Sequence, residues 1–416
     1  METKKKILVF IPEFPVLTET FIERELTKLA ERGNVELTVF SLKKGKNKLS
    51  DVLKDKVYYG RYCFRDFFRG VIYTFSNFPK ILKVFFDFRK DLRESRDVKD
   101  GCIRPGFFKQ IYIFLKSIGY AEKFLHFNPD FILAHFLSEP STMVMHISKI
   151  TGVPYGISAH AKDIMVTSEY TRLKVKTAKF ITICNKNAYR SVLDQAKGLN
   201  VSNVNLAYHG VDIQKILVTS ENKDFRTDKP LILANGRLVE KKGFPYLIEA
   251  SKILKEKGLN FLVYIIGFGP LYQELLDSIN SSGLSDDIRI VGDNKGITID
   301  EVFLYYRAAS IFAFPSIKTD EGDVDGVANV LLEAGIFEVP VVSTDAGSTG
   351  ELIIDGVSGL VVPQKDSKLL AEKIEILLKD EDLRNKLGKG LYKKVLEGFN
   401  LDKNIVQLEN MLKSSY

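Results

Sequence analysis

Short apolar runs alternate with longer segments of helical periodicity along almost the whole chain, and this alternation restricts its possible folds more than any other feature. The first example is ILVFIP, followed by TETFIERELTKLAERG and then VELTVFSL. A strand, a helix and a second strand in this order predict a parallel βαβ unit. Within the helical segment, Thr20 and Glu23 have the spacing of a capping box. Further candidate strands follow in FILAHF, PYGISAH, FITIC and NVNLAYHG.

The pattern starts again after the polar, charged stretch TSENKDFRTDKP. Six more apolar runs alternate with helical segments: LILANGR, FLVYIIG, IRIVG, IFAFP, VPVVST and GLVVP. Because 416 residues are enough for two domains, we predict an α/β protein with two doubly wound, Rossmann-like parallel-sheet domains. We place the first domain at 1–212, a linker at 213–230 and the second domain at 231–395. A last helix over 396–416 is expected to cross back to the first domain.

Residues 60–118 depart from this alternation, because they are dense in Phe and Arg and contain no good strand pattern. Between Arg61 and Lys116 there are 13 Lys and Arg against 6 Asp and Glu, and 11 of the 29 Phe. The resulting surplus of seven positive charges equals that of the whole chain. Basic charge interleaved with aromatic side chains is typical of a helix on an anionic membrane surface. The alternative is a helical insertion whose Phe side chains pack on the first domain.

Composition excludes several classes of protein. Cys63, Cys102 and Cys184 are scattered without a CxxC pair, which argues against a disulfide framework or a cysteine-rich metal site and fits a reducing compartment. The apolar run at 7–11 is too short for a signal peptide, and no stretch reaches the roughly 18 apolar residues of a membrane span. We therefore expect a cytoplasmic protein, soluble or peripheral on the inner face of the plasma membrane.

Two basic side chains follow the first strand of the second half. In NGRLVEKKG, Gly236 and Arg237 end the predicted strand and Lys242 precedes a helix. Ligands of open α/β sheets bind at the carboxyl ends of the strands. A pyrophosphate would suit an Arg and a Lys there, although two surface basic residues are the alternative. The glycine turn that begins at Gly267 lacks the third glycine of a dinucleotide fingerprint. In the first half, His160 ends a predicted strand and is a further candidate, or a structural histidine.

Two carboxylates bracket an uncharged segment in DVDGVANVLLEA. Asp325 would stand in a loop, and Glu333 would lie nearly two turns inside a helix that starts near Val327. The positive end of that helix, with its exposed N–H groups, suits an anion. The alternative is an N-terminal capping Asp followed by an ordinary helical Glu.

In this order and at these spacings, the segments GRLVEKKG, GFGPL, FPS, DGVANVLLEAG, VPVVSTDAG and GELIIDGVSGLVVP resemble glycosyltransferase family 4. FPVLTETFIERE, AHF, SAHAKDI and YHGVD resemble its bacterial exopolysaccharide and lipopolysaccharide branch. The resemblance is weakest at 60–118. It implies the GT-B fold, in which two Rossmann-like domains face a central cleft. It also implies retaining, metal-independent transfer of a hexose-type sugar. The donor would be a nucleotide sugar, UDP- or GDP-linked, and the acceptor a glycan or a lipid-linked oligosaccharide for a cell-surface polysaccharide.

The resemblance also assigns roles at matching positions. It implies that Arg237 and Lys242 hold the diphosphate, with Gly236 and Gly267 in the donor-binding loops. Glu333 would bind the ribose hydroxyls. The backbone of Asn329 and Val330 would touch phosphate.

Two further roles concern the sugar. Asp325 would bind the sugar ring, and His160 would contact it from the first domain. Where the family has Glu, this chain has Asp325, whose carboxylate is one methylene shorter, and the glycine pair of a later loop is Gly347-Ser348. No cofactor and no bound metal are expected, because two cations and a helix N-terminus can stabilise a leaving diphosphate.

Two alternatives share the same fold. One is a nucleotide-sugar 2-epimerase, since a fold does not fix a reaction. The other is an inactive sugar-nucleotide-binding scaffold subunit, which only the Asp325 substitution favours. Expected partners are a nucleotide sugar, an acceptor glycan and an anionic membrane surface, with no nucleic acid.

Overall fold

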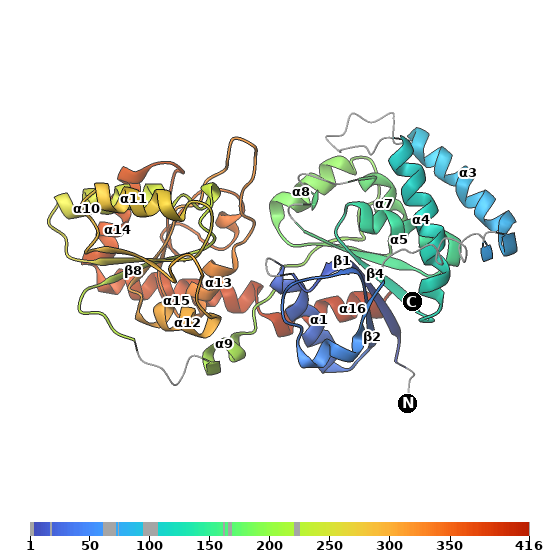
Figure 1. Cartoon of the computed structure of the whole chain (residues 1–416), viewed down its shortest axis with the longest axis horizontal. Coiled ribbons are helices and arrows are strands. Elements are labelled where there is room, and N and C mark those ends of the chain that lie inside the picture. The colour runs from blue at the N-terminus through green and yellow to red at the C-terminus, as the bar shows by residue number, and fades with distance from the viewer. Residues whose placement is uncertain are drawn as a thin grey trace. The chain divides into compact units, whose positions relative to one another are not determined.

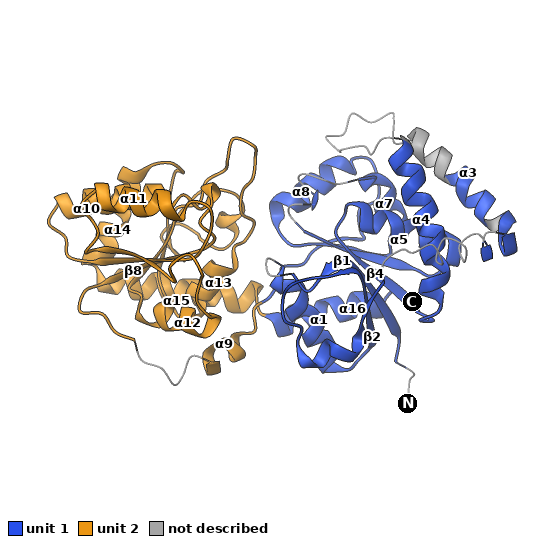
Figure 2. Cartoon of the chain, in the orientation of Figure 1, with its two compact units in different colours: residues 1–210, 401–416 blue, residues 211–400 orange. Residues whose placement is uncertain are grey.

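The computed structural model describes residues 4–16, 19–60, 72–73, 75–94, 107–160, 163–164, 169–219 and 225–415. The chain divides into two compact units, drawn in separate colours in Figure 2. Unit 1 contains residues 1–210 and 401–416, and unit 2 contains residues 211–400.

Unit 1 is built on a seven-stranded parallel sheet, whose strand order is β3-β2-β1-β4-β5-β6-β7. The strands are β1 (Lys6–Phe14), β2 (Glu36–Lys44), β3 (Val57–Tyr59), β4 (Phe131–His135), β5 (Tyr155–Ala159), β6 (Ile181–Ile183) and β7 (Val204–Leu206). Six of these strands coincide with the predicted apolar runs. The edge strand β3 was not predicted, because three residues carry no alternation that could reveal it.

Helices cover both faces of this sheet (Figure 1). They are α1 (Thr20–Arg32), α3 (Phe78–Glu94), α4 (Phe107–Leu125), α5 (Glu139–Thr151), α7 (Thr171–Thr177), α8 (Lys186–Gln195) and α16 (Leu401–Lys413), with a 3₁₀ turn at Asp51–Lys56. Alternate side chains of β1 point to opposite faces. Val9 packs in a core with α1 and α16, whereas Phe10 packs in a core with α4 and α5. The two cores of unit 1 therefore lie on opposite faces of one sheet.

The capping box predicted for α1 is wrong. The residue before the helix is Glu19, and no side chain caps the helix there. Thr20 is already the first helical residue, so Glu23 lies one position too far along to complete the box. The Glu23 carboxylate instead accepts hydrogen bonds from Thr27 Oγ1 at 3.4 Å and from the N–H of Ser50 at 3.2 Å. It thereby ties α1 to the 3₁₀ turn that follows β2.

Unit 2 has a six-stranded parallel sheet with the order β10-β9-β8-β11-β12-β13. Its strands are β8 (Leu231–Asn235), β9 (Leu262–Ile266), β10 (Ile288–Val291), β11 (Ile311–Phe314), β12 (Val341–Thr344) and β13 (Leu360–Val362). Each of them lies within one of the six runs predicted for the second half. The second doubly wound sheet is confirmed.

The helices of unit 2 also cover both faces of its sheet (Figure 1). They are α9 (Ile213–Thr219), α10 (Phe244–Glu256), α11 (Tyr272–Ser281), α12 (Ile299–Ala308), α13 (Asn329–Ile336), α14 (Ser367–Lys379) and α15 (Glu381–Gly398), with 3₁₀ turns at Glu240–Lys242 and Thr349–Glu351. Helices α10, α11 and α14 share one core with the sheet. Helix α9 begins at the first residue assigned to the linker, and 220–224 lie outside the described residues.

The last helix of the chain belongs to unit 1 rather than to the unit that precedes it. Its apolar side chains, among them Ile405 and Leu412, are buried in the same core as α1. Its carboxylate Glu409 is 2% exposed and lies 2.9 Å from Nε of Arg32. Asn34 donates to the same carboxylate at 3.1 Å. The C-terminal residues therefore complete the fold of the N-terminal ones.

Within the basic, aromatic segment, α3 and α4 are helices, and residues 61–71, 74 and 95–106 lie outside the described part. One side of these helices is buried, including Ile81 and Phe114, which pack in the core shared with α5. Phe86 and Phe108 on the same helices are 57% and 85% exposed. The segment thus packs on unit 1 and also presents apolar side chains to solvent.

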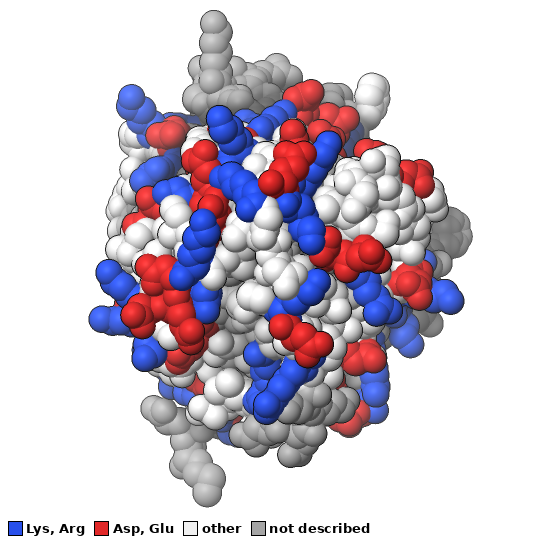
Figure 3. Space-filling view, turned by 90° about the vertical axis from the view of Figure 1, so that its left-hand side faces the viewer, with Lys and Arg blue, Asp and Glu red and all other residues white. Residues whose placement is uncertain are grey.

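Among the described residues, no helix has both the length and the apolar character that crossing a bilayer requires. On the face drawn in Figure 3, Lys and Arg side chains lie among Asp and Glu side chains. That mixture differs from the basic stripe of a nucleic-acid-binding surface.

Candidate functional site

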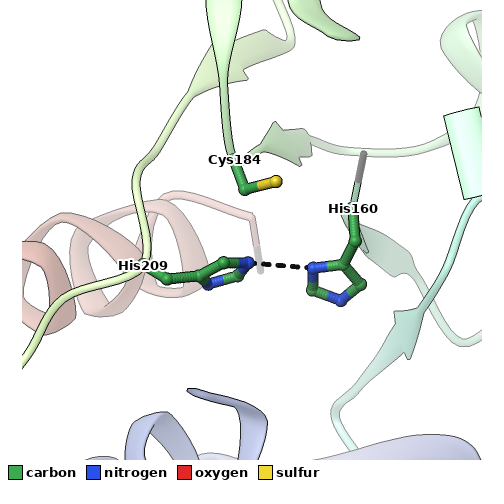
Figure 4. A group of neighbouring side chains, drawn as sticks. All are labelled: His160, Cys184 and His209. Carbon is green, nitrogen blue, oxygen red and sulfur yellow. Dashed lines mark hydrogen bonds between the residues drawn. The ribbon is translucent and has the colours of Figure 1, made fainter. Parts of the chain in front are cut away.

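Four side chains of unit 1 come together where the strands of its sheet end. His135 is the last residue of β4, while His160 directly follows β5 and Cys184 directly follows β6. His209 lies shortly beyond the end of β7. The carboxyl ends of parallel strands form one edge of a sheet, where open α/β folds bind their ligands. This edge is the candidate site of unit 1 (Figure 4).

A chain of polar contacts runs through these residues. Oε2 of Glu25, on α1, lies 3.6 Å from Nδ1 of His209. Nε2 of His209 lies 2.9 Å from Nδ1 of His160, and Nε2 of His160 lies 3.3 Å from Nδ1 of His135. The ring of Phe21 stacks on His209 with centroids 4.2 Å apart. One carboxylate and three imidazoles therefore form a continuous hydrogen-bonding chain.

Burial and neighbouring charges divide the chain into a charged half and a neutral half. Burial is the largest single influence on the pKa of Glu25 and raises it, but the hydrogen bond to His209 and the charges of His209 and His135 together lower that pKa below its usual value. Burial is the largest single influence on the pKa of His209 and lowers it, but hydrogen bonds to Cys184 and Glu25 and the charges of these two groups together raise the pKa to about 9. Burial has the largest effect on the next two imidazoles. It holds the pKa of His160 well below its usual value and lowers that of His135 to about 4.

The protonation states fix the direction of each hydrogen bond. At neutral pH, His209 carries both ring protons and donates from Nε2 to Nδ1 of His160. His160 is neutral, so its proton lies on Nε2 and is donated to Nδ1 of His135. The proton of His135 then lies on Nε2, a buried atom that has no hydrogen-bond partner among the described residues. The chain is therefore polarised from Glu25 towards His135.

A buried carboxylate holds the segments after β4 and β5 together. Asp163 accepts a hydrogen bond from the N–H of His160 at 2.8 Å and another from the N–H of Leu137. Burial raises the pKa of Asp163 to about 7, although both backbone donors favour its ionised form. Lys174 donates to the carbonyl oxygen of Ser138 at 2.9 Å and to that of Leu137. These contacts fix the backbone on which His160 stands.

In unit 2, Asp325 lies between two lysines. Its Oδ2 is 2.7 Å from Nζ of Lys242, and its Oδ1 is 3.5 Å from Nζ of Lys241. The hydroxyl of Ser316 donates to Oδ2 at 3.3 Å, and Asp323 lies 3.0 Å from Nζ of Lys241. The lysines come from the 3₁₀ turn after β8, and Ser316 and the acids come from the loop after β11. This group of side chains joins the carboxyl ends of two adjacent strands.

The two predicted glycines, Gly236 and Gly267, allow the loops after β8 and β9 to approach each other closely. A Cβ on Gly267 would lie 2.0 Å from the carbonyl oxygen of Gly236, a distance that no side chain tolerates. The N–H of Gly236 donates to the carbonyl oxygen of Ile266 at 3.0 Å, so the loops after β8 and β9 touch. The side chain of Arg237 is exposed and makes no hydrogen bond or ion pair with the residues that the structure describes. Its guanidinium is accessible to an anion.

Glu333 lies about one turn into α13, because the helix begins at Asn329 rather than near Val327. Its side chain is buried close to Tyr306. Burial raises the pKa of Tyr306 well above its usual value, and the neighbouring Glu333 carboxylate adds to the rise. The Tyr306 hydroxyl donates to the carbonyl oxygen of Val330 at 3.1 Å. Tyr306 therefore contacts both the first turn of α13 and the carboxylate of Glu333.

The predicted donor-binding residues thus occupy one edge of the unit 2 sheet. Lys242 and Asp325 are in direct contact. Arg237 follows β8, and Asn329 opens the helix that carries Glu333. His160, the remaining predicted residue, stands at the corresponding edge of the unit 1 sheet.

Sequence reasoning missed the partners of these residues. His135, Cys184 and His209 follow predicted strands just as His160 does, so the same rule could have found them. Glu25 is one of several acids on an amphipathic helix and carried no signal of its own.

The chain resembles known glycosyltransferases over its whole length. Residues 218–394 match the family model described as glycosyl transferases group 1. The putative colanic acid biosynthesis glycosyltransferase WcaL of Salmonella typhimurium is 26% identical over 427 residues, spanning 98% of this chain and 100% of that protein. The amylovoran biosynthesis glycosyltransferase AmsK of Erwinia amylovora is 32% identical over 216 residues, spanning 52% of this chain and only 49% of that protein.

Solved structures with low sequence identity share the fold. HepE of Anabaena, solved in complex with UDP, has a TM-score of 0.65 at 16% identity and covers 99% of this chain and 100% of its own. Sucrose-phosphate synthase of Thermosynechococcus elongatus has a TM-score of 0.68 at 14% identity, with 99% of both chains covered. Two parallel-sheet units, together with these matches, define the GT-B fold. The second unit of this chain is therefore similar to the glycosyl transferases of group 1.

Proposed function

We propose that this glycosyltransferase moves a hexose-type sugar from a nucleotide sugar, UDP- or GDP-linked, to a glycan or lipid-linked acceptor during assembly of a cell-surface polysaccharide. The names of two relatives, the putative colanic acid biosynthesis glycosyltransferase WcaL and the amylovoran biosynthesis glycosyltransferase AmsK, support the pathway. A UDP complex of the similarly folded HepE supports a nucleotide donor. The contact between Lys242 and Asp325, at the sheet edge that also carries Arg237 and Glu333, is the observation that carries the proposal.

The donor would bind at this edge of unit 2. Arg237 is exposed, and its planar guanidinium can pair with two phosphate oxygens. Lys242 adds a second cation, held in place by Asp325 at 2.7 Å. Helix α13 presents its positive end next to the loop that carries Asp325. Two cations and the positive end of a helix would together stabilise a departing diphosphate.

We infer that the transfer retains the anomeric configuration and needs no divalent metal. The acceptor hydroxyl would attack the anomeric carbon on the face from which the diphosphate leaves. As the carbon–oxygen bond to phosphate breaks, the hydroxyl proton would pass to the departing phosphate oxygen. No protein nucleophile is then required, which agrees with the engagement of Asp325 by two lysines. The cations would supply the charge that a metal provides in other transferases.

The proposal is tested with the full-length protein, a panel of UDP- and GDP-sugars and an extract of bacterial lipid-linked oligosaccharides. We expect release of the nucleoside diphosphate with one donor and an α-linked product in excess EDTA. Lys242→Ala should reduce kcat/KM by a factor that corresponds to a loss of roughly 2–4 kcal/mol of transition-state stabilisation. Lys252→Ala, an exposed position on α10, is the matched control and should behave as wild type.

Three outcomes would contradict parts of this proposal. Unchanged kcat/KM in folded Lys242→Ala protein removes the lysine from the reaction. A product of inverted configuration excludes the retaining mechanism. Activity that EDTA abolishes and only Mg²⁺ or Mn²⁺ restores excludes metal independence.

We also propose that α3 and α4 dock the enzyme on an anionic membrane, where a lipid-linked acceptor would be presented. Phe78 and Phe86 on α3, and Tyr112 on α4, are 54%, 57% and 59% exposed. Lys83 is exposed on α3, and most of the basic side chains of this segment lie outside the described residues. Exposed aromatic side chains beside basic ones fit an interface of acyl chains and lipid phosphates.

A further inference from the structure

The candidate site of unit 1 has a composition that sugar transfer does not require. A thiol and two imidazoles converge in it: Cys184 after β6, His160 after β5 and His209 after β7 (Figure 4). One ligand atom from each side chain lies within 4.8 Å of the other two. Cys184 is a free thiol. Two imidazole nitrogens and one sulfur form a common ligand set of zinc.

The second ring nitrogen of each histidine also has a partner, as in most metal sites. Nδ1 of His209 lies 3.6 Å from the carboxylate of Glu25, which leaves Nε2 directed at the centre of the group. Nε2 of His160 lies 3.3 Å from His135, which leaves Nδ1 directed inwards. A carboxylate or another acceptor on the outer nitrogen fixes ring orientation and makes the ligating nitrogen more basic. The three ligands and this outer layer thus form a complete site.

The distances require only small movements. Tetrahedral zinc with Zn–N bonds of about 2.0–2.1 Å needs its two nitrogens about 3.3 Å apart. Nδ1 of His160 and Nε2 of His209 are 2.9 Å apart while they share a proton. A zinc ion would displace that proton and the thiol proton, and the rings would separate by about half an ångström. The Cys184 sulfur lies within 4.8 Å of both nitrogens.

The burial of the three residues favours an open site. His160 is buried, whereas Cys184 and His209 are partly exposed to solvent. A metal ion can therefore enter from solvent, and its fourth position remains available to water or another ligand.

We propose that His160, Cys184 and His209 of unit 1 bind a zinc-type divalent cation. The binding itself does not depend on the proposed function. If His160 contacts the sugar, as proposed above, bound zinc would occupy it and slow transfer. Zn²⁺ would then be an inhibitor that a chelator removes, which is compatible with a reaction that needs no metal.

The test is a Co²⁺ titration of the reduced, chelator-treated full-length protein. A thiolate bound to Co²⁺ gives a charge-transfer band in the near ultraviolet. We expect this band to saturate at one equivalent in the wild type and to disappear when Zn²⁺ displaces the Co²⁺. Cys184→Ser should abolish the band, and His209→Asn should weaken Co²⁺ binding by at least about tenfold. The double variant Cys63→Ser, Cys102→Ser retains Cys184 and should keep the band.

The outer layer gives a second measurement. Glu25→Gln keeps the size of the side chain and removes its charge, and should weaken metal binding by about 10- to 100-fold. His126→Ala alters an exposed histidine outside the cluster and should leave binding unchanged. The proposal is overturned if the wild type takes up no Co²⁺, or if the band persists in Cys184→Ser. Circular dichroism establishes whether each variant is folded. Where a variant is not folded, the Co²⁺ titration of the wild type still decides whether the protein takes up the metal.

Discussion

At the scale of single residues, Asp325 is the most informative position. Both of its carboxylate oxygens are engaged, Oδ2 by Lys242 at 2.7 Å and Oδ1 by Lys241 at 3.5 Å. The carboxylate therefore neutralises part of the charge that a diphosphate would use. Glu333 has a different environment, since it is buried in α13 next to Tyr306. Two carboxylates eight positions apart in the sequence thus face different groups.

This difference predicts opposite effects on nucleotide affinity. Asp325→Asn keeps the shape of the side chain but frees both lysines, so free UDP or GDP should bind at least as tightly as to wild type, while turnover falls. Glu333→Gln removes a charged acceptor of hydrogen bonds from the proposed ribose site. It should weaken nucleoside diphosphate binding by about 1.5–3 kcal/mol. Isothermal titration calorimetry measures both constants, and equal losses in the two variants would refute this division of roles.

At the scale of elements, α3 and α4 each have a buried and an exposed apolar side. Ile81 and Phe114 pack in the unit 1 core, whereas Phe78 and Phe86 are 54% and 57% exposed. A helix that served only as a packed insertion would gain nothing from these exposed rings. The buried side agrees with the interpretation as a helical insertion, and the membrane surface stays a proposal that rests on the exposed side.

Liposome co-sedimentation tests the exposed side. Wild-type protein should pellet with vesicles that contain anionic lipid, and binding should weaken with salt without vanishing, because buried rings are insensitive to screening. The double variant Phe78→Ser, Phe86→Ser should bind at least about tenfold more weakly, since each ring contributes up to about 1.5–3 kcal/mol when buried. Ile299→Ser, at a residue of unit 2 that is 54% exposed, is the control. If wild type and double variant pellet equally, these rings do not contact lipid.

The elements themselves were largely predictable from the sequence, because a parallel strand is buried on both faces and appears as an apolar run. The runs that became β8 to β13 all show this. What remained hidden were contacts between segments far apart in the chain. Glu25, His135 and His209 become neighbours only through the order of the strands, which no local pattern encodes. The capping box at Thr20 was wrong for a related reason. The Glu23 carboxylate accepts a hydrogen bond from the N–H of Ser50, which lies 27 positions further along the sequence.

At the scale of the whole molecule, the chain leaves unit 1 after residue 210 and returns to it at residue 401. Unit 2 is therefore inserted within unit 1, and α16 supplies part of the core around α1. The ion pair between Glu409 and Arg32 at 2.9 Å joins the two ends of the sequence. The stability of the first unit thus depends on the last residues.

Two adjacent positions of α16 test this dependence. Ile405 is 1% exposed and Val406 is 39% exposed. Ile405→Ala should destabilise unit 1 by about 2–5 kcal/mol, the usual cost of emptying a buried aliphatic site. Val406→Ala should cost less than about 1 kcal/mol. Urea denaturation monitored separately for each unit should place the loss in unit 1, and a loss confined to unit 2 would show that α16 does not support the first unit.

The return of the chain to unit 1 through α16 also determines the order in which the two units are completed during synthesis. Residues 211–400 leave the ribosome before α16 does, and at about 5–20 residues per second this takes roughly 10–40 s. During this interval the core around α1 lacks the side chains of α16, although most of unit 1 has already been made. A transcript truncated near codon 400 would yield a complete second unit joined to a first unit whose core lacks Ile405 and Leu412. Exposed apolar surface of this kind is prone to aggregation until α16 is in place.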